Sequence, residues 1–296
     1  MISAVINTLN EEKNLARAVA SVRGLADEIV VVDMESTDNT REVARKLGTK
    51  VFTHKKEKYV EAVRNFMISK ASGEWILVLD PDEEISPKLA KILKGLPRGG
   101  RKDSSGVVVA DYYRIPRKNI IFGKWIKHCR WWPDFQIRFF KKGYVSWNEV
   151  IHAVPMTQGK GLDLPEKEDL AIIHKNYSSL EEYLAKMNRY TSVQAEELLK
   201  NGYVFDWKDL IKKPFREFLG RYFAGQGYKD GVHGLTLCFL QSFSELVLYL
   251  KIWQKQGFRE QEIKRSEIKN EFGSLIKELR WWLRKELTWL KLPKWR

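Results

Sequence analysis

The sequence has little cysteine and no long apolar run, and both absences exclude classes of protein. Cys129 and Cys238 are the two cysteines in 296 residues, too few for a disulfide scaffold or a four-cysteine zinc site. They favour two reduced structural thiols in a reducing compartment. The most apolar stretch, residues 235–253, is interrupted by polar and charged residues and is too polar to predict a membrane span. The first residues lack the basic segment of a signal peptide, so we expect a cytoplasmic protein.

Two phosphate-binding motifs are also missing. No Gly-x-Gly-x-x-Gly follows the first predicted strand, which argues against a dinucleotide-dependent dehydrogenase. No Walker loop occurs in the chain, which argues against a P-loop phosphotransferase. Both absences narrow the kinds of enzyme that the sequence suggests.

The composition is that of a folded, strongly basic protein. Hydrophobic residues make up 44% and charged residues 30%, which excludes wholesale disorder. The 52 basic and 38 acidic residues give a net charge of +14. Such a charge favours polyanionic partners, namely nucleic acid, anionic lipid or a phosphorylated substrate. The composition does not choose among them.

Residues 1–95 alternate short apolar runs with helical patterns that end at glycine or alanine. β-branched runs between helices are typical of a parallel sheet buried on both faces, so we predict a doubly wound α/β fold. The predicted strands are 3–6, 28–33, 50–53 and 75–80, and the predicted helices are 12–24, 39–48 and 60–71.

The remaining chain falls into two further parts. Short strands at 107–109, 136–140 and 171–173 amid aromatic-rich loops predict a mixed extension of the sheet that carries a second binding surface. From 176 onward the pattern is helical, with helix starts near 179, 206, 230 and 259. We therefore expect a domain at 1–175, made of a nucleotide half (1–95) and an acceptor half (96–175), followed by a helical region at 176–296.

Carboxylates gather where predicted strands end. Asp33 ends the second strand, and Asp80 and Asp82 follow the fourth. Ligands of open α/β sheets bind beyond the carboxyl ends of the strands. Acids this close repel one another unless a cation neutralises them, and oxygen ligands suit Mg²⁺ or Mn²⁺ bound to a diphosphate. The alternative is that the acids begin a helix capped by Ser86, with Pro87 in its first position.

These motifs together resemble a family 2 glycosyltransferase of the GT-A fold, in the branch that resembles lipopolysaccharide-core glucosyltransferases. The similarity extends over roughly residues 1–255, and the last forty residues fall outside it. The segments that carry it are Asn7-Thr8-Leu9-Asn10-Glu11-Glu12, Asp33-Met34-Glu35-Ser36-Thr37-Asp38-Asn39-Thr40, Arg64-Asn65, Leu79-Asp80-Pro81-Asp82-Glu83, Pro133-Asp134-Phe135-Gln136-Ile137-Arg138-Phe139-Phe140, Ser179 to Tyr190, and Phe215 to Gly234.

The resemblance implies transfer of a sugar from a nucleotide-diphospho-sugar with inversion at the anomeric carbon. Asp82 is then the principal metal ligand for Mn²⁺ or Mg²⁺. Asp80 faces the ribose or the metal, Arg64 meets the diphosphate, and Asp33 hydrogen-bonds the base. The nucleoside pocket is then lined by Thr8, Asn10 and Glu12. Each has a structural alternative, such as a helix cap for Asn10 or a turn carboxylate for Asp33.

The catalytic base is left between two carboxylates. An inverting transfer needs one carboxylate to take the acceptor proton. Related sequences carry a His-Glu pair near this point, whereas here Ala153 follows His152. Glu149 and Asp134 are the candidates for the base. His152 is a candidate for a further metal ligand, because imidazole suits Mn²⁺, although a single histidine is more often structural.

The end of the chain indicates a membrane surface. Residues 277–296 carry seven basic and two acidic residues, a net +5, and four of the eleven tryptophans. Apolar residues recur at helical spacing from 268 to 290. A basic amphipathic helix with tryptophans is typical of an anionic bilayer interface. The alternative is a helix that packs its apolar side onto the domain.

The leading hypothesis is an inverting, metal-dependent glycosyltransferase that acts on a glycan or lipid-linked acceptor, peripherally at the cytoplasmic face of the membrane. A polyprenyl-phosphate glycosyltransferase is the enzymatic alternative. A basic nucleic-acid-binding protein is possible from charge and tryptophans alone, but no nucleic-acid motif occurs and we expect no nucleic acid. A degenerate nucleotide-sugar-binding protein is the remaining alternative, because of Ala153.

Overall fold

The computed structural model describes residues 1–57, 60–96, 110–148 and 155–286, and it divides the chain into two compact units. Unit 1 comprises residues 1–120 and 132–176, and unit 2 comprises residues 121–131 and 177–296. The segment 121–131 thus leaves unit 1 between two of its strands and belongs to the helical unit. We describe the two units separately.

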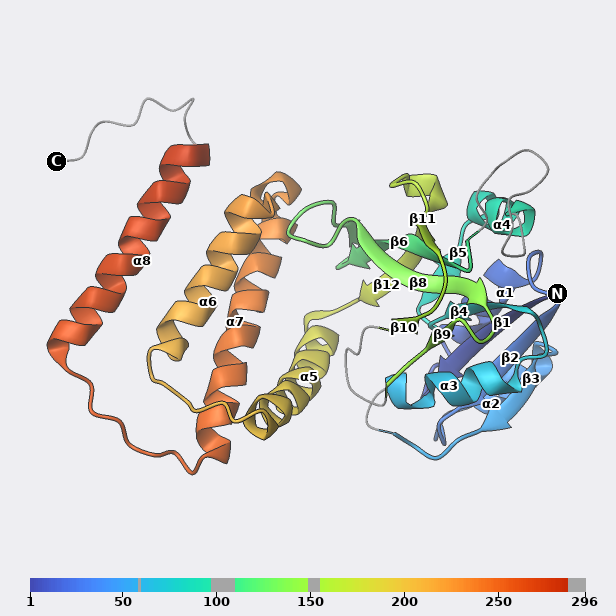
Figure 1. Ribbon diagram of the computed structural model, residues 1–296, viewed down its shortest axis with the longest axis horizontal. Coiled ribbons are helices and arrows are strands. Elements are labelled where there is room, and N and C mark those ends of the chain that lie inside the picture. Colours follow the sequence, from blue (N-terminus) through green and yellow to red (C-terminus); the bar gives the residue numbers. More distant parts are fainter. Residues whose placement is uncertain (58–59, 97–109, 149–154, 287–296) are drawn as a thin grey trace. The chain divides into compact units, whose positions relative to one another are not determined.

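Unit 1 is an α/β unit built on one large mixed sheet (Figure 1). Its strands are β1 (Ile2–Thr8), β2 (Glu28–Asp33), β3 (Lys50–Thr53), β4 (Trp75–Leu79), β5 (Glu83–Ile85), β6 (Tyr112–Ile121), β8 (Asp134–Lys141), β9 (Val145–Ser146), β10 (Met156–Thr157), β11 (Gly161–Asp163) and β12 (Ile172–Tyr177). Its helices are α1 (Leu15–Val22), α2 (Thr40–Lys46), α3 (Glu61–Lys70), α4 (Pro87–Gly95) and the 3₁₀ turn η1 (Glu168–Leu170).

The sheet runs in the order β3-β2-β1-β4-β8-β6-β12-β5. β3, β2, β1 and β4 are parallel to one another, whereas β8 is antiparallel to both β4 and β6. The carboxyl ends of β1, β2 and β4 therefore lie side by side at one edge of the parallel part. This order confirms the predicted α/β class and places the strand-end acids on one edge.

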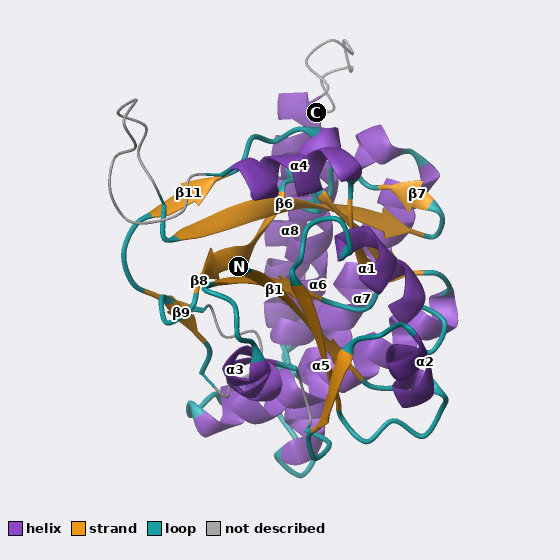
Figure 2. Ribbon diagram, turned by 90° about the vertical axis from the view of Figure 1, so that its right-hand side faces the viewer, coloured by secondary structure: helices purple, strands orange, loops and turns teal. Residues whose placement is uncertain are grey.

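Both faces of the parallel sheet are covered, which explains why every residue of β1 is buried. Alternate strand residues enter two cores, one shared with α1, α2 and α4 and the other shared with α3. Figure 2 shows helices on the two sides of the sheet. The predicted strands and helices of residues 1–95 are present with bounds shifted by a few residues, and Ser86 caps α4 through a bond from the Leu89 N–H, with Pro87 first in the helix.

Unit 2 is helical, apart from the segment 121–131. Its elements are β7 (Lys124–Trp125), α5 (Leu180–Lys200), α6 (Asp209–Leu219), the π-helical turn η2 (Gly220–Ala224), the 3₁₀ turn η3 (Gly227–Asp230), α7 (Val232–Lys255) and α8 (Arg265–Glu286). α7 packs against α5 and α6 and supplies Leu237, Leu248 and Ile252 to the apolar clusters of this unit. By length and composition alone α7 is apolar enough to cross a membrane, although 28% of its most apolar window is buried within the fold.

A hydrogen-bonded carboxylate ties the amino ends of the central strands together, away from the strand-end acids. Glu28 of β2 accepts hydrogen bonds from the Lys50 ammonium, the Ser3 hydroxyl and the Ser72 N–H. Burial by itself would raise the pKa of Glu28, but these donors outweigh it and lower the pKa to about 2. The ionised form is therefore favoured in the folded protein.

We expect Glu28→Gln to reduce the free energy of unfolding at pH 7 by about 1–3 kcal/mol, because charge-assisted bonds are lost. A carboxylate whose pKa is lowered by folding stabilises the folded protein at pH values above the pKa that it has in the unfolded chain. This stabilisation is lost as the pH falls toward the pKa in the folded protein. The difference between the two proteins should therefore shrink from near pH 4.5 toward pH 2. Urea unfolding across this range measures it, with the exposed Glu42→Gln as the control. A difference that is constant with pH would contradict the assignment.

Candidate active site

The loops after β1 and β2 are held together by side chains that the sequence predicts to line a nucleoside pocket. The Asp33 carboxylate is fully buried and accepts bonds from the Ser36 N–H (3.0 Å), the Ser36 hydroxyl (2.5 Å) and the Thr8 hydroxyl (3.2 Å). The Arg41 guanidinium lies 3.6 Å from it. Asp33 and Thr8 thus contact each other, but contact between Asp33 and a base requires these internal bonds to exchange.

Asn10 and Glu12 join the same two loops closer to solvent. The Asn10 amide oxygen accepts from the Thr37 N–H at 2.8 Å, and Glu12 accepts from the Asn39 N–H and side-chain amide at 3.0 Å. Asn10 is exposed and has a φ of +58°, a left-handed conformation that asparagine tolerates better than most residues. Asn10 therefore joins two loops and does not cap a helix.

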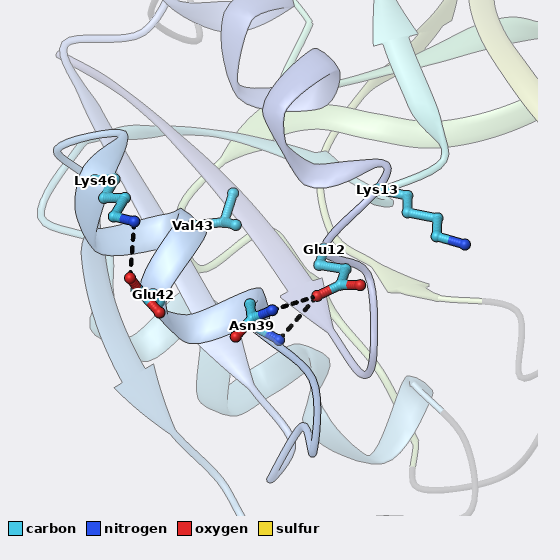
Figure 3. Close-up of a pocket in the computed structure, with 6 residues that line it drawn as sticks. All are labelled: Glu12, Lys13, Asn39, Glu42, Val43 and Lys46. Atoms are coloured by element: carbon cyan, nitrogen blue, oxygen red, sulfur yellow. Dashed lines mark hydrogen bonds and ion pairs between the residues drawn. The ribbon is translucent and has the colours of Figure 1, made fainter.

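A surface pocket of about 540 Å³ lies beside Glu12 (Figure 3). The figure shows the Glu12 carboxylate turned toward Asn39 and the Lys46 ammonium toward Glu42, while Lys13 extends away. None of the residues around Asp80 lines this pocket. It is a polar hollow between the start of α1 and α2, and we do not assign the chemistry to it.

Asp80, which follows β4 directly, forms ion pairs with two buried arginines. The Arg64 guanidinium of α3 donates to one of its oxygens at 2.6 Å, and the Arg138 guanidinium of β8 donates to the other at 2.5 Å. Both arginine side chains are 6% exposed. Burial would raise the pKa of Asp80, but Arg138 and Arg64 outweigh it and hold the pKa far below its usual range. Asp80 is ionised at any physiological pH.

The arginine–carboxylate pairing continues across the sheet. Arg138 also donates to Glu83 at 2.7 Å, and the Arg117 guanidinium bridges Glu83 (3.1 Å) and Asp134 (2.7 Å). We call these six residues the ion-pair chain: Arg64, Asp80, Arg138, Glu83, Arg117 and Asp134. Three positive and three negative charges alternate, so the cations that neutralise the acids around Asp80 are arginines of α3, β6 and β8.

Asp134 is held at the far end of the ion-pair chain. Its carboxylate also accepts from the Asn119 amide at 3.1 Å and the Gln136 amide at 2.7 Å. Burial would raise its pKa, but Arg117 and these amides outweigh it and the pKa is lowered. A carboxylate stabilised in this way is a weaker proton acceptor.

Asp82 is paired with a histidine. The His174 imidazole of β12 places Nε2 3.4 Å from an Asp82 oxygen, and its Nδ1 lies 2.6 Å from the Asn119 amide oxygen. β12 reaches this point because it pairs antiparallel to β5, and the Lys175 N–H donates to the Asp82 carbonyl at 2.9 Å. Asn119 thus fixes the ring of His174 and contacts Asp134 at the same time.

The predicted metal set is only partly placed. His152 of that set lies outside the described residues, as does Glu149, a candidate for the catalytic base. Within residues 1–57, 60–96, 110–148 and 155–286, no group of three or more histidine, cysteine, aspartate or glutamate side chains gathers as a metal site. Both Asp80 oxygens bond to arginines. The pair Asp82 and His174 supplies one carboxylate and one imidazole, a donor set that suits Mn²⁺ when a diphosphate supplies further oxygens.

Sequence reasoning missed His174, Arg117, Glu83 and Asn119 as site residues. Glu83 stands within a run of acids in the sequence, and the sequence pattern predicts no strand at β6, which carries Arg117 and Asn119. A signal for His174 was present, because a polar His-Lys-Asn follows two isoleucines at the end of a predicted strand. Polar residues at a strand end were used as evidence for β1, β2 and β4 but not for this strand.

The comparison with known proteins identifies the class. The glycosyl transferase family 2 model matches residues 3–154. The chain belongs to glycosyl transferase family 2, and it is a glycosyltransferase with the α/β fold of the GT-A type. This result confirms the predicted family and enzyme class.

Two relatives in sequence are themselves named as glycosyltransferases. An uncharacterized glycosyltransferase of Rickettsia typhi is 29% identical over 260 residues, which cover 85% of this chain and 86% of the relative. The lipopolysaccharide core biosynthesis glycosyltransferase LpsC of Rhizobium meliloti is 22% identical over 264 residues, with 87% and 94% covered. Among solved structures, residues 1–349 of S. aureus TarS match at 15% identity with a TM-score of 0.43, covering 89% of this chain and 94% of that one.

Proposed function

We propose that this glycosyltransferase is inverting and metal-dependent, and that it moves a sugar from a nucleotide-diphospho-sugar to a glycan or lipid-linked acceptor at the cytoplasmic face of a membrane. The observation that carries the proposal is the pair Asp82–His174, in which a carboxylate oxygen and Nε2 lie 3.4 Å apart. Asp82 follows Asp80, the partner of Arg64 in a buried ion pair, by two positions in the sequence. A carboxylate, an imidazole and a guanidinium at the end of a parallel strand suit a cation and a diphosphate.

Asp82 and His174 are the proposed metal-binding residues. A Mn²⁺ or Mg²⁺ bound there supplies charge stabilisation for the departing nucleotide diphosphate. Asn119 holds the imidazole orientation through His174 Nδ1, as outer partners of metal-binding histidines commonly do. Asp80, a predicted metal ligand, is instead assigned to anchoring Arg64 and Arg138, because its oxygens are taken by both. His152 stays a proposal from the sequence.

Arg64 is proposed to meet the diphosphate. One of its terminal nitrogens bonds to Asp80, whereas Nη1 is buried and has no hydrogen-bond partner among the described residues. The buried Asn7 Oδ1, on the same face of the sheet, likewise has none. Unpaired buried polar atoms are costly, and a polar ligand at this strand end would satisfy them. The nucleoside is proposed to lie at the loops that carry Thr8, Asn10, Glu12 and Asp33.

A panel of nucleotide-diphospho-sugars tests the proposal. Each is added to the purified protein with and without Mn²⁺, and unfolding temperature and donor hydrolysis are followed. We expect at least one donor to raise the unfolding temperature and to be hydrolysed only when the metal is present, since a ligand that binds the folded state stabilises it. Metal-independent binding and turnover of every active donor would overturn the metal dependence.

The acceptor proposal follows the relative that is named for lipopolysaccharide core biosynthesis. We propose a cell-envelope glycan or its lipid-linked form as acceptor. With the active donor in hand, sugar-bearing acceptors are assayed beside polyprenyl phosphate. Transfer to polyprenyl phosphate alone would select the enzymatic alternative in which the lipid phosphate itself is glycosylated.

Two carboxylates, Glu149 and Asp134, are proposed as alternatives for the catalytic base. The pH dependence of kcat distinguishes between them. Asp134 has a lowered pKa and three hydrogen-bond donors, so we expect Glu149→Gln to lower kcat by roughly 10²-fold and to remove the acid limb of the profile. Asp134→Asn should lower kcat less and keep that limb. The reverse pattern would assign the base to Asp134.

Membrane association is proposed to use the outward side of α8. The inward side packs on α6 through three ion pairs, Lys208–Glu267, Lys212–Glu271 and Arg216–Glu278, and Leu275 between them is buried. Phe272 and Ile276, one turn apart, are 49% and 47% exposed. Lys269 and Arg280 are exposed three or four residues from them, hence on the same side of the helix. Aromatic and aliphatic groups beside cations suit an anionic bilayer.

We expect Phe272→Glu to weaken binding to vesicles of mixed anionic and zwitterionic lipid by roughly tenfold, because apolar burial is lost and a charge is added. Sedimentation with the vesicles measures the bound fraction. Asn270→Glu adds the same charge elsewhere on α8 and is the control. Equal effects of the two variants would show that net charge, and not this face, governs binding.

A further inference from the structure

Unit 2 brings the two cysteines of the chain into contact. The sulfur atoms of Cys129 and Cys238 lie 3.2 Å apart, although the residues are 109 positions apart in sequence. Both side chains are fully buried, in an apolar cluster with Ile121, Ile126 and Leu237. Cys129 belongs to the segment 121–131 that connects β6 to β8, and Cys238 belongs to α7.

Several bonds fix the position of the Cys129 sulfur. Cys129 has a φ of +57°, its N–H donates to the Gly225 carbonyl at 2.6 Å, and its carbonyl accepts from the Arg221 guanidinium at 2.9 Å. The neighbouring His128 N–H donates to the buried Asp230 carboxylate at 2.8 Å. Because the left-handed residue is anchored on both sides, Cys129 is directed at α7 by the fold itself and not by a mobile loop.

We propose that Cys129 and Cys238 are a site of reversible oxidation, at which peroxide converts the two thiols into an intramolecular disulfide. Closing the gap to a covalent bond of ~2.05 Å needs a shift of roughly 1 Å, which side-chain rotation supplies. Peroxide is small enough to reach the sulfurs during brief local opening of the helices in unit 2, whereas a bulky disulfide such as oxidised glutathione would have no room beside two buried sulfurs.

The two cysteines have different parts in the reaction. The hydrogen bond from Cys238 and the Arg221 guanidinium lower the pKa of Cys129 more than burial raises it, whereas the pKa of Cys238 is raised by Cys129 and by burial. The Cys129 thiolate attacks one oxygen of the peroxide and the O–O bond breaks, so that Cys129 becomes a sulfenic acid. The hydroxide that leaves takes up the proton released by the Cys129 thiol and forms the first water. The Cys238 sulfur then attacks the Cys129 sulfur and expels the second oxygen as water. Two thiols and one peroxide give one disulfide and two waters.

The disulfide would tie the segment 121–131 covalently to α7. The strands that this segment joins carry Arg117 and Asp134 of the ion-pair chain, so the modification acts on the connection between two site-bearing strands. The site itself does not depend on the proposed glycosyltransfer mechanism, and its test needs no substrate.

Intact mass and thiol titration test the proposal on the full-length protein. After peroxide treatment we expect a loss of about 2 Da, the disappearance of both thiols under denaturing conditions, and recovery on adding dithiothreitol. Peptide mapping should join the peptides that contain Cys129 and Cys238. Cys129→Ala and Cys238→Ala should each abolish the mass loss. Retained thiols, a gain of oxygen atoms without a cross-link, or disulfide-linked dimers would overturn the proposal.

Thermal unfolding shows whether the bond forms within the native fold. A cross-link that closes a long loop restricts the unfolded chain, so the oxidised protein should unfold at a temperature roughly 5 °C or more above that of the reduced protein. An equal or lower unfolding temperature would show that the sulfurs join only in unfolded molecules, and this would also overturn the proposal.

Discussion

Replacing Arg138 by methionine is expected to destabilise the protein by about 3–5 kcal/mol, the usual cost of removing one partner from a buried ion pair. Arg138 is 6% exposed and bonds to Asp80 and to Glu83, whose side chain is fully buried. Methionine fills much of the volume but leaves both carboxylates without that donor. Urea unfolding at pH 7 measures the change in the free energy of unfolding.

Arg114→Met is the matched control. Arg114 lies on the same strand as Arg117 and forms a two-pronged ion pair with Asp163, but the two side chains are 49% and 41% exposed. Exposed pairs contribute little, so we expect a loss below about 1 kcal/mol. Similar losses in both variants would mean that burial of the ion-pair chain does not determine its importance.

Two further measurements separate the ion pair from simple packing. Adding Glu83→Gln to Arg138→Met should recover part of the lost stability, because Arg138→Met leaves two arginines against three carboxylates in the ion-pair chain and Glu83→Gln makes the numbers equal again. The deficit should also shrink at low pH. Asp80 has a lowered pKa in the wild-type protein, so its contribution is present above its unfolded pKa and is lost as the pH falls below it. A deficit unchanged by acid and by Glu83→Gln would point to a cavity instead.

The sequence identified the parallel part of the sheet because its signals are local. Runs such as Glu28–Asp33 are short, β-branched and followed by a helix that ends at glycine. β6 was missed for a local reason as well. Pro116 stands within a run that also holds Arg117 and Asn119, and a proline in a run argues against a strand. Pro116 nonetheless lies within the strand, in regular register opposite Phe135 of β8.

The partners of the acids were out of reach of sequence reasoning. Neighbouring carboxylates need a cation, and the sequence alone favours a metal for Asp80. The structure supplies Arg64 from α3 and Arg138 from β8, contacts that span 16 and 58 positions. Spacing rules describe one helix or strand and do not reach such pairs. Similarly, the Cys129–Cys238 contact arises from the packing of α7 on a distant segment.

Asp82→Asn is expected to reduce sugar transfer by about 10³-fold or more while the protein stays folded, because an amide cannot supply the negative charge that a divalent metal requires. Asp82 lies 3.4 Å from His174 and is outside the ion-pair chain, so the arginine pairs of Asp80 and Glu83 remain. Initial rates with the donor found by the panel, at several Mn²⁺ concentrations, measure the loss.

His174→Gln tests the same site from the other strand. Glutamine keeps a hydrogen-bonding group near Asn119 but is a poor metal ligand, so the Mn²⁺ concentration for half-maximal activity should rise by roughly 10- to 100-fold. Asp163→Asn, at an exposed carboxylate paired with Arg114, is the control and should leave transfer unchanged.

Asp82→Asn and His174→Gln should have the same effect on unfolding temperature if both side chains bind the metal. At the Mn²⁺ concentration that half-saturates the wild-type protein, either variant should lose most of the Mn²⁺-dependent stabilisation by the donor, whereas unfolding without donor and metal should change little. A variant whose unfolding temperature is already low in the absence of donor and metal has lost structural stability, and its lower activity would not report on a metal contact. If Asp82→Asn retains wild-type transfer and the same Mn²⁺ dependence, then the strand-end acids have a structural task alone, and the cation that assists the diphosphate must be provided by arginines such as Arg64.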